Sequence, residues 1–273
     1  MLTFFICAQL LQGAPEPWRV EGRSLYVWEE AKKIAEGGPS GDLLRFCAEK
    51  RVARLYFMFD GKDVAPVRGF VRAARASNVQ VHAMHPGDLA DWLDPFPPAF
   101  DHKVVVDWAR TTAGLKLFDG LHLDVEPHGH VSWREHKMKL AKGYLELIQL
   151  CRQAAGKEVL LSAALPWNWE AVEVDGKPLI ARAQDVLDWV SIMAYRGANA
   201  QSVVSAIEGE WAYRPGRVEL IVETDRKVVE EGVPLHVGTE AKMEAVFAAA
   251  RERFGDRLME AIHHYSTWKT LPR

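Results

Sequence analysis

Short apolar segments rich in β-branched and aromatic residues recur along the chain at fairly regular intervals. Eight of them are predicted strands: Ser24–Trp28, Arg54–Phe59, Val79–Met84, Gly120–Glu126, Val159–Pro166, Trp189–Tyr195, Val218–Glu223 and Met259–Tyr265. Segments with apolar positions three and four residues apart lie between them and predict helices: Val64–Ser77, Trp133–Ala155, Ala200–Trp211 and Glu240–Phe254. Repeated alternation of strand and helix indicates a parallel sheet.

Eight strands with intervening helices favour a closed barrel over an open doubly wound sheet. No GxGxxG pattern follows any of the strands, so the sequence indicates no dinucleotide site and we predict no cofactor. Although 273 residues could form two domains, barrels of this kind commonly reach about 250 residues as one unit. We therefore predict an α/β protein with a single-domain (β/α)8 TIM barrel over residues 21–273.

Composition narrows the classes of function. The chain is 48% hydrophobic and 26% charged, with a net charge of −3 and scattered basic residues, so a nucleic-acid partner is not expected. Cys7, Cys47 and Cys151 have no CxxC spacing, which argues against a disulfide framework or a zinc knuckle. Beyond the N-terminus no apolar run is long enough to cross a bilayer. The oligomeric state stays open.

The N-terminus has an ambiguous pattern. An apolar stretch from Leu2 to Leu11 has the length of a signal-peptide core, but no basic residue precedes it, and Pro15 follows Ala14, the best small residue for cleavage. Residues 1–20 are accordingly either a signal or an N-terminal extension. The first case predicts export to the periplasm or the extracellular space, and the second predicts a cytoplasmic protein.

The segment FDGLHLDVEPHG, from Phe118 to Gly129, combines a strand pattern with titratable residues. Leucine and valine occupy every second position, which on a strand places three titratable side chains together on the opposite face. These side chains are His122, Asp124 and Glu126. We expect the apolar face to pack on helices and the titratable face to meet a polar cavity.

Active sites of (β/α)8 barrels lie at the carboxyl ends of the strands. The residues at those ends are polar or aromatic in nearly every case: Asp60, His85, Asp124, Glu126, Trp167, Asn168, Trp169, Tyr195, Arg196, Glu223, Tyr265 and Trp268. Aromatic rings stack on the apolar faces of sugars, and an amide can bind their hydroxyl groups. The combination predicts a carbohydrate ligand.

Two motifs carry a resemblance to a known family. DGLHLDVE resembles the DGxDxDxE signature of the chitinase-like glycoside hydrolases of family eighteen, with Asp124 and Glu126 matching and His122 in place of the first inward Asp. DWVSIMAYRG, residues 188–197, is similar to that family's MxYD motif, with Tyr195 matching and Arg196 in place of the Asp. Trp268 resembles the Trp that forms the floor of the sugar site.

The resemblance implies a role for three residues. Glu126 would protonate the leaving oxygen, Asp124 would orient a substrate acetamido group as the nucleophile, and Tyr195 would hydrogen-bond the acetamido carbonyl. Physical chemistry supports one part of this, because two carboxylates on one strand face repel each other and one pKa should rise. The chain is thus predicted to cleave an oligo- or polysaccharide by carboxylate acid/base catalysis.

The departures from the family leave alternatives open. His122 could hydrogen-bond Asp124, and Arg196 could pair with an anionic sugar or with Glu223. Glu223 could instead be a nucleophile opposite Glu126, a choice that their separation would decide. A second function is a non-catalytic carbohydrate-binding barrel. A metal-dependent hydrolase is the third, although HxxH at residues 82–85 lacks a catalytic zinc spacing and we predict no metal site.

Overall fold

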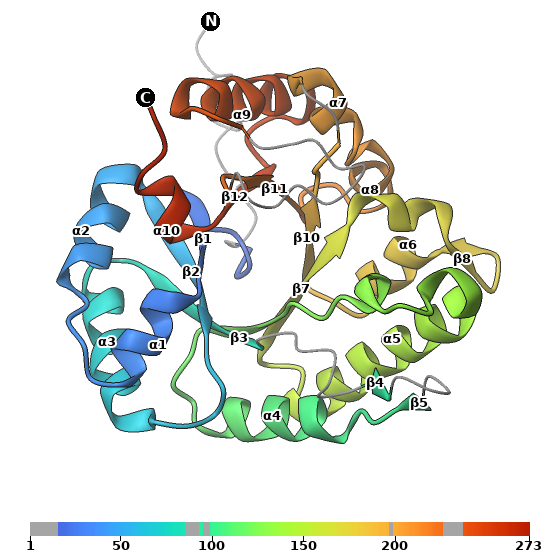
Figure 1. Cartoon of the computed structure of the whole chain (residues 1–273), viewed down its shortest axis with the longest axis horizontal. Coiled ribbons are helices and arrows are strands. Elements are labelled where there is room, and N and C mark those ends of the chain that lie inside the picture. The colour runs from blue at the N-terminus through green and yellow to red at the C-terminus, as the bar shows by residue number, and fades with distance from the viewer. Residues whose placement is uncertain (1–15, 86–92, 95–98, 197–198, 226–236) are drawn as a thin grey trace, which may run out of the picture.

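The computed structural model describes residues 16–85, 93–94, 99–196, 199–225 and 237–273. Eight parallel strands close into a barrel in the order β1-β2-β3-β6-β7-β10-β11-β12, with β12 paired to β1, and helices surround it (Figure 1). The predicted single-domain (β/α)8 barrel is therefore confirmed. Residues 1–15, which hold most of the possible signal, lie outside the described part. No helix within the described part is both long and apolar enough to span a membrane.

All eight predicted strands are present in the barrel. Their bounds are β1 Arg23–Val27, β2 Val52–Met58, β3 Gln80–His85, β6 Gly120–Leu123, β7 Leu160–Pro166, β10 Trp189–Met193, β11 Val218–Glu223 and β12 Met259–His263. Two short antiparallel pairs lie outside the barrel: β4 Leu93–Asp94 with β5 Ala99–Phe100, and β8 Glu173–Val174 with β9 Lys177–Pro178.

The helices follow the strands around the barrel. Their bounds are α1 Glu29–Ala35, α2 Gly41–Lys50, α3 Val64–Ala76, α4 Lys103–Gly114, α5 Trp133–Ala155, α6 Leu179–Gln184, α7 Ala200–Ser205, α8 Glu208–Tyr213, α9 Glu240–Phe254 and α10 Tyr265–Trp268, with 3-10 turns η2 Pro127–Gly129 and η3 Trp167–Ala171.

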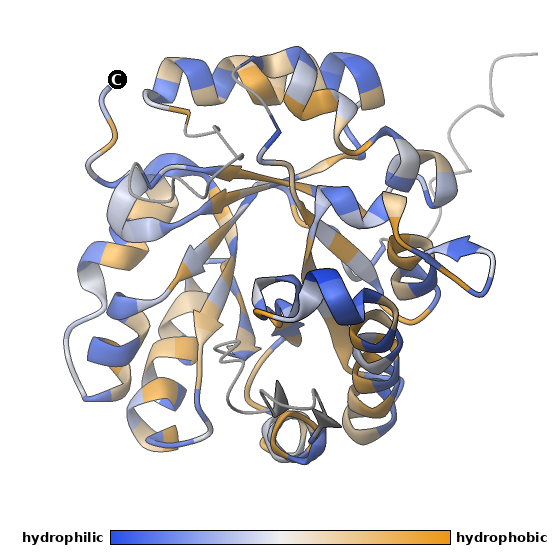
Figure 2. Cartoon of the chain, turned by 45° about the vertical axis from the view of Figure 1, so that its right-hand side comes forward, coloured by the Kyte–Doolittle hydropathy of each residue, from blue (hydrophilic) through white to orange (hydrophobic). Residues whose placement is uncertain are grey.

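The main core lies between the barrel and the helix ring, as the apolar faces in Figure 2 indicate. Helix α3 illustrates the cause. Its buried residues are Val67, Phe70, Val71 and Ala74, spaced by three and four positions, so they form one stripe along the helix. That stripe faces the sheet while the charged residues of α3 stay in water.

Strand β6 shows why the alternation in FDGLHLDVEPHG matters. Leu121, Leu123 and Val125 are at most 1% exposed and belong to the outer core, whereas His122 is buried in the barrel interior. The first residue of the strand is a glycine, and a Cβ at Gly120 would lie 2.4 Å from ring atoms of His82 on the neighbouring β3. The sequence therefore places the three titratable residues on the inner side of the barrel wall.

Several predicted bounds differ from those of the structure, and three of the differences have a local reason. Strand β6 ends at Leu123, the last residue that pairs with β7, so Asp124 and Glu126 follow the strand rather than belong to it. The predicted helix over residues 200–211 is interrupted at Ile207, where the backbone leaves helical geometry and the side chain is fully buried. Strand β12 ends at His263, and Tyr265 begins α10.

Candidate active site

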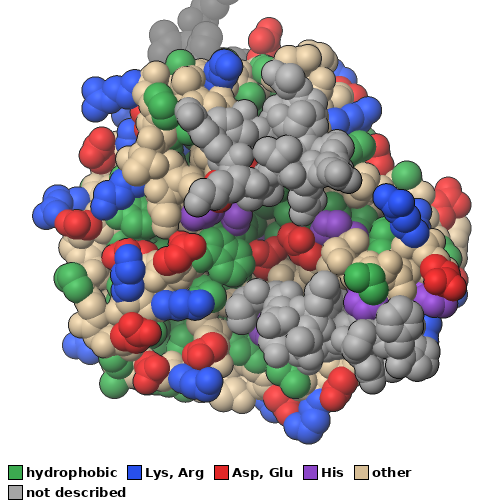
Figure 3. Space-filling model, viewed as in Figure 1, with side chains coloured by type: hydrophobic (Ala, Val, Ile, Leu, Met, Phe, Trp, Pro, Cys, Tyr) green, Lys and Arg blue, Asp and Glu red, His purple; other side chains and the backbone are tan. Residues whose placement is uncertain are grey.

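A cavity of about 250 Å³ lies at the carboxyl ends of the barrel strands. In the space-filling view along the barrel, acidic and histidine side chains gather near the centre of this face (Figure 3). Six of the site residues predicted from the sequence line it: Asp124, Glu126, Trp167, Asn168, Tyr195 and Glu223. The lining residues are Tyr26, Asp124, Glu126, His128, Ala164, Pro166, Trp167, Asn168, Met193, Tyr195, Ile221, Glu223 and His263.

The cavity contains three carboxylates on two sides of the barrel. Asp124 and Glu126 follow β6, and Glu223 is the last residue of β11. The side chain of Glu126 is 37% exposed, whereas that of Glu223 is 2% exposed. Glu126 is thus the carboxyl group that a substrate reaches most easily.

Glu223 is the acceptor of a hydrogen-bonded chain that begins at Trp28. The Trp28 indole N–H donates to His263 Nε2 at 3.0 Å, and His263 Nδ1 lies 2.8 Å from Glu223 Oε2. An indole nitrogen can only donate, so Nδ1 carries the proton that Glu223 accepts. The Asp225 backbone N–H donates to the other Glu223 oxygen at 2.7 Å. Both oxygens of Glu223 are therefore engaged, and the described residues include no ion pair between Glu223 and Arg196.

Burial works against a proton on His263, but the hydrogen bond and charge of Glu223, together with the charges of Asp124 and Asp225, outweigh it and raise the pKa of His263. The Trp28 N–H limits this rise, because Nε2 must stay unprotonated to accept its hydrogen bond. His263 is thus hydrogen-bonded to Glu223 on one side of the cavity and is affected by the charge of Asp124 on the other.

Asp124 is a carboxyl group of the cavity with a raised pKa. Burial raises its pKa to about 6, and the charge of His263 opposes the rise. Within the part of the chain that the structure describes, no group donates a hydrogen bond to this carboxylate. Burial is the largest cause of the raised Asp124 pKa. The repulsion between carboxylates that the sequence suggested is therefore not its main cause.

The raised pKa predicts a stability effect of Asp124→Asn. The folded protein holds the Asp124 proton more tightly than the unfolded chain, whose value is 3.8, so the free energy of unfolding falls as the pH rises from about 4 to about 6. We expect the variant to be more stable than the wild type at pH 7.5, by up to about 3 kcal/mol, with no such gain at pH 3.5. Urea unfolding at the two pH values measures this, and an equal effect at both would contradict it.

Glu126 has an imidazole beside it. His128 Nε2 lies 3.7 Å from Glu126 Oε2, and burial lowers the pKa of His128 to about 4. His128 is therefore neutral near neutral pH, and the contact is not an ion pair under those conditions. Near neutral pH His128 therefore adds no positive charge beside Glu126.

Aromatic and amide groups form one side of the cavity. Trp167 and Asn168 line it, and the Arg196 guanidinium carbon lies 4.7 Å from the centre of the Trp167 ring. Trp169 is different, because it is 1% exposed and packs against Trp133 at 5.8 Å between ring centres. The structure places Trp169 in the core and not in the cavity.

Arg196 is not among the lining residues, and five other predicted site residues also lie away from the cavity lining. His122 is buried below it and bonds to Tyr26 and Ser162, not to Asp124. Asp60 is exposed beside Lys62, and His85 packs edge-on against Trp108. Tyr265 and Trp268 are turned toward Phe46 of α2, on the outside of the barrel. Trp268 therefore does not form the floor of this cavity.

The structure adds cavity residues that we did not predict. Tyr26 on β1 lines the cavity, and so do His128 and His263. For His263 a signal was present, because it lies in a predicted strand and only one of the adjacent His263 and His264 can face inward. Tyr26 has apolar neighbours on both sides along β1, so the sequence pattern does not decide whether its ring faces the barrel interior or the helices.

The histidines and carboxylates do not form a metal centre in the described part of the chain, where no group of three or more His, Cys, Asp or Glu side chains has an arrangement able to hold a metal ion. His82 and His85 lie on opposite faces of β3. His82 contacts Tyr56 and Trp189 inside the barrel, and His85 contacts Trp108 outside it.

Comparison with known proteins finds similarity in structure only. No family model matches the sequence, and no curated protein matches it. A chitinase from Bacteroides thetaiotaomicron has a TM-score of 0.60 at 11% identity, covering 90% of both chains. A GH18 chitinase from Pseudoalteromonas aurantia has a TM-score of 0.57 at 12% identity, covering 90% of this chain and 94% of the other.

The likeness extends beyond one family of glycoside hydrolases. The GH53 catalytic domain from Ignisphaera aggregans has a TM-score of 0.58 at 13% identity, covering 94% of this chain and 89% of that domain. Identities this low speak for the fold alone. The chain has the (β/α)8 barrel fold of the chitinase-like glycoside hydrolases of family eighteen, from which its sequence is strongly divergent.

Proposed function

We propose that the protein is a glycoside hydrolase that cleaves an oligo- or polysaccharide, with Glu126 as general acid and Asp124 as the carboxylate that orients the substrate. One observation carries the proposal: a single cavity at the carboxyl ends of the strands contains Asp124, Glu126 and Tyr195 beside Trp167 and Asn168. These are the groups that acid catalysis on a sugar requires, namely a proton donor, a second carboxylate and an aromatic surface.

The two carboxyl groups that follow β6 differ in a useful way. Glu126 is partly exposed and lies next to a neutral imidazole, which suits a group that gives its proton to a leaving oxygen. Asp124 accepts no hydrogen bond from the described residues, so its oxygens are available to an N–H of the ligand. An acetamido N–H is the donor that the family resemblance implies. Tyr195 lines the same cavity, where its hydroxyl can meet the acetamido carbonyl.

Glu223 is the weaker candidate for the second carboxylate. Its two oxygens accept from His263 and from the Asp225 backbone, so attack on a sugar carbon would compete with both hydrogen bonds. The same bonds suit Glu223 to a different task, which is to hold His263 in one orientation beside the cavity. We therefore assign Asp124 rather than Glu223 to work with Glu126.

A non-catalytic carbohydrate-binding barrel is the alternative, and two residues favour it. His122 replaces the first inward Asp of the family motif and hydrogen-bonds Tyr26 and Ser162, which leaves no acidic group under Asp124. Arg196 replaces a further Asp and lies on Trp167. Such a protein would retain sugar binding without turnover.

The experiment incubates the protein with chitotetraose, cellotetraose and xylotetraose, in parallel with and without EDTA, and follows new reducing ends by mass spectrometry. We expect cleavage of the acetamido sugar. Calorimetric binding of chitotetraose with no cleavage would instead identify a binding protein. Activity that disappears with EDTA and returns with a divalent metal would overturn the carboxylate mechanism.

Trp167 predicts a binding effect that holds for an enzyme and for a binding protein. Trp167→Ala removes the half-buried ring that lines the cavity, so chitotetraose should bind about tenfold more weakly, as expected for the loss of about 1.4 kcal/mol of stacking and burial. Trp211→Ala is the matched control, because Trp211 packs on Phe254 away from the cavity. Calorimetric titration measures both, and equal affinities in the two variants would remove Trp167 from the site.

A further inference from the structure

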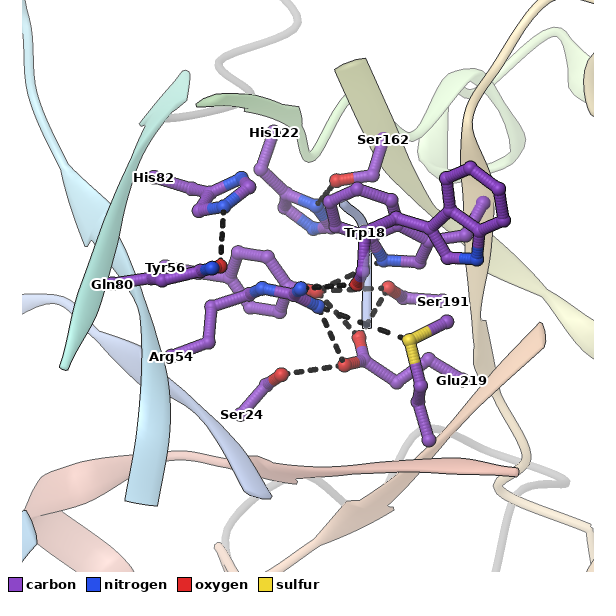
Figure 4. A network of polar contacts seen from close by, with 12 residues as sticks. Trp18, Ser24, Arg54, Tyr56, Gln80, His82, His122, Ser162, Ser191 and Glu219 are labelled. Carbon is purple, nitrogen blue, oxygen red and sulfur yellow. Dashed lines mark hydrogen bonds and ion pairs between the residues drawn. The ribbon is translucent and has the colours of Figure 1, made fainter. Parts of the chain in front are cut away.

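The barrel interior below the cavity is polar and carries a buried ion pair. Arg54 Nη1 lies 3.7 Å from Glu219 Oε1, and both side chains are fully buried. Glu219 also accepts hydrogen bonds from Ser24 at 2.5 Å and from the Tyr56 hydroxyl at 2.6 Å (Figure 4). Tyr56 connects this ion pair to the residue that departs from the family motif, His122.

His122 is held on three sides. The Tyr56 ring stacks on its imidazole with 3.8 Å between ring centres and an angle of 25°. Its Nε2 lies 2.9 Å from the Tyr26 hydroxyl, and its Nδ1 lies 2.7 Å from Ser162 Oγ (Figure 4 shows the Ser162 contact). Burial and then the charge of Arg54 lower the pKa of His122 well below its usual value. The ring is therefore neutral, with one nitrogen that donates and one that accepts.

The surrounding acceptors decide which nitrogen carries the proton. Ser162 Oγ lies 3.5 Å from the Leu121 carbonyl oxygen, to which it can donate. Ser162 then accepts from Nδ1–H, and Nε2 accepts from the Tyr26 hydroxyl, so all three hydrogens have an acceptor. With the proton on Nε2, the Tyr26 hydrogen would lose His122 as its acceptor, and the structure contains no hydrogen bond from the Tyr26 hydroxyl to another described residue. Buried polar hydrogens are nearly always paired, which favours the first arrangement.

We infer that His122 is a positioning residue that directs the Tyr26 hydroxyl hydrogen away from the cavity, so that Tyr26 presents an acceptor to a ligand and Asp124 keeps no protein donor. Tyr26 lines the cavity together with Asp124, and the Asp124 charge contributes to the raised pKa of Tyr26, after burial and Tyr56. The two residues line one cavity, and the Tyr26 hydroxyl is hydrogen-bonded to His122. This inference rests on the proposed function only for the identity of the cavity as the ligand site.

The Asp124 charge acts on three other titratable groups: it raises the pKa values of His263 on β12, Tyr144 on α5 and Tyr26 on β1. Of these, only Tyr26 is bonded to His122. A change at His122 should therefore reach Asp124 through the Tyr26 hydroxyl.

The first test reads the proton position directly. Long-range ¹H–¹⁵N correlation spectra of the ¹⁵N-histidine-labelled protein distinguish a protonated from an unprotonated ring nitrogen. We expect His122 to carry its proton on Nδ1 at every pH between 5 and 8. A proton on Nε2, or titration of His122 in this range, would overturn the inference. The measurement uses the wild-type protein, so it does not depend on the folding of any variant.

The second test is a cycle of variants read by ¹³C NMR titration of the Asp124 carboxyl group. His122→Phe keeps a ring against Tyr56 but removes the acceptor of Tyr26, whose hydroxyl can then turn to Asp124. A new hydrogen bond to the carboxylate should lower the Asp124 pKa by about one pH unit. Tyr26→Phe should leave that pKa near 6, and the double variant should match Tyr26→Phe.

Two outcomes of the cycle would overturn the inference. One is a raised Asp124 pKa in Tyr26→Phe, which would show that Tyr26 already donates to Asp124. The other is an equal change in His122→Phe with and without the Tyr26 hydroxyl. The carboxyl titration needs no substrate, so a protein that cleaves no glycan would contradict the proposed function while leaving this test intact.

Discussion

Glu126→Gln is expected to lower the rate of glycan cleavage by about 10²–10⁴-fold, the contribution of a positioned proton donor. Glutamine has nearly the same shape as glutamic acid but cannot deliver a proton to a leaving oxygen. Glu126 is partly exposed in the cavity, and its neighbour His128 is neutral near neutral pH. Under the proposed function the substitution removes the proton donor while keeping the shape of the side chain, so binding of chitotetraose should remain within a fewfold of the wild type.

The matched control is Glu135→Gln in the first turn of α5. Its side chain is 77% exposed, so the same chemical change there should leave cleavage and binding unaltered. Initial rates and calorimetric titrations of both variants separate the outcomes. If Glu126→Gln cleaves as fast as Glu135→Gln, another group is the acid. If it loses binding together with cleavage, Glu126 holds the ligand rather than reacting with it.

Glu219→Gln is expected to destabilise the fold by about 3–5 kcal/mol, because it leaves the Arg54 charge in the barrel interior without its partner. Both side chains are fully buried, and Glu219 also accepts from Ser24 and Tyr56. The amide can keep some of these hydrogen bonds but not the charge. Urea unfolding measures the loss of stability as a lower midpoint urea concentration, while the dependence of the unfolding free energy on urea stays the same.

An exposed ion pair provides the comparison. Asp42→Asn breaks the pair between Asp42 and Arg45 on α2, whose side chains are 65% and 78% exposed, and should cost less than about 1 kcal/mol. Combining Arg54→Met with Glu219→Gln removes both charges and should recover part of the lost stability. A single Glu219→Gln variant as stable as Asp42→Asn would show that the interior pair contributes no net stabilisation.

The strands and most helices could be predicted because their causes are local. Apolar residues at alternate positions can bury only one face of a strand, and those of α3 at spacings of three and four form one helical stripe. The order of strands and helices then leaves few topologies other than a barrel. The same local rule placed Asp124 and Glu126 together, since side chains two residues apart along a strand path point to one side.

Partners across the barrel could not be predicted in this way. Glu223 and His263 lie 40 residues apart, and their hydrogen bond depends on the register between β11 and β12. Tyr265 and Trp268 follow the same strand, but α10 turns their rings onto Phe46, because burial against α2 is available to them there. Nothing in the local pattern distinguishes an aromatic residue that enters the cavity from one that packs behind it.

By itself the sequence determined the fold class, the strand that leads to the site and the pair Asp124 and Glu126, because each depends on the period of side chains along one segment. The tertiary structure alone decided that His122 bonds to Tyr26 instead of Asp124, that Glu223 holds His263, and that burial raises the pKa of Asp124 to about 6. These outcomes depend on which groups converge from separate strands, and convergence is fixed only when the barrel closes.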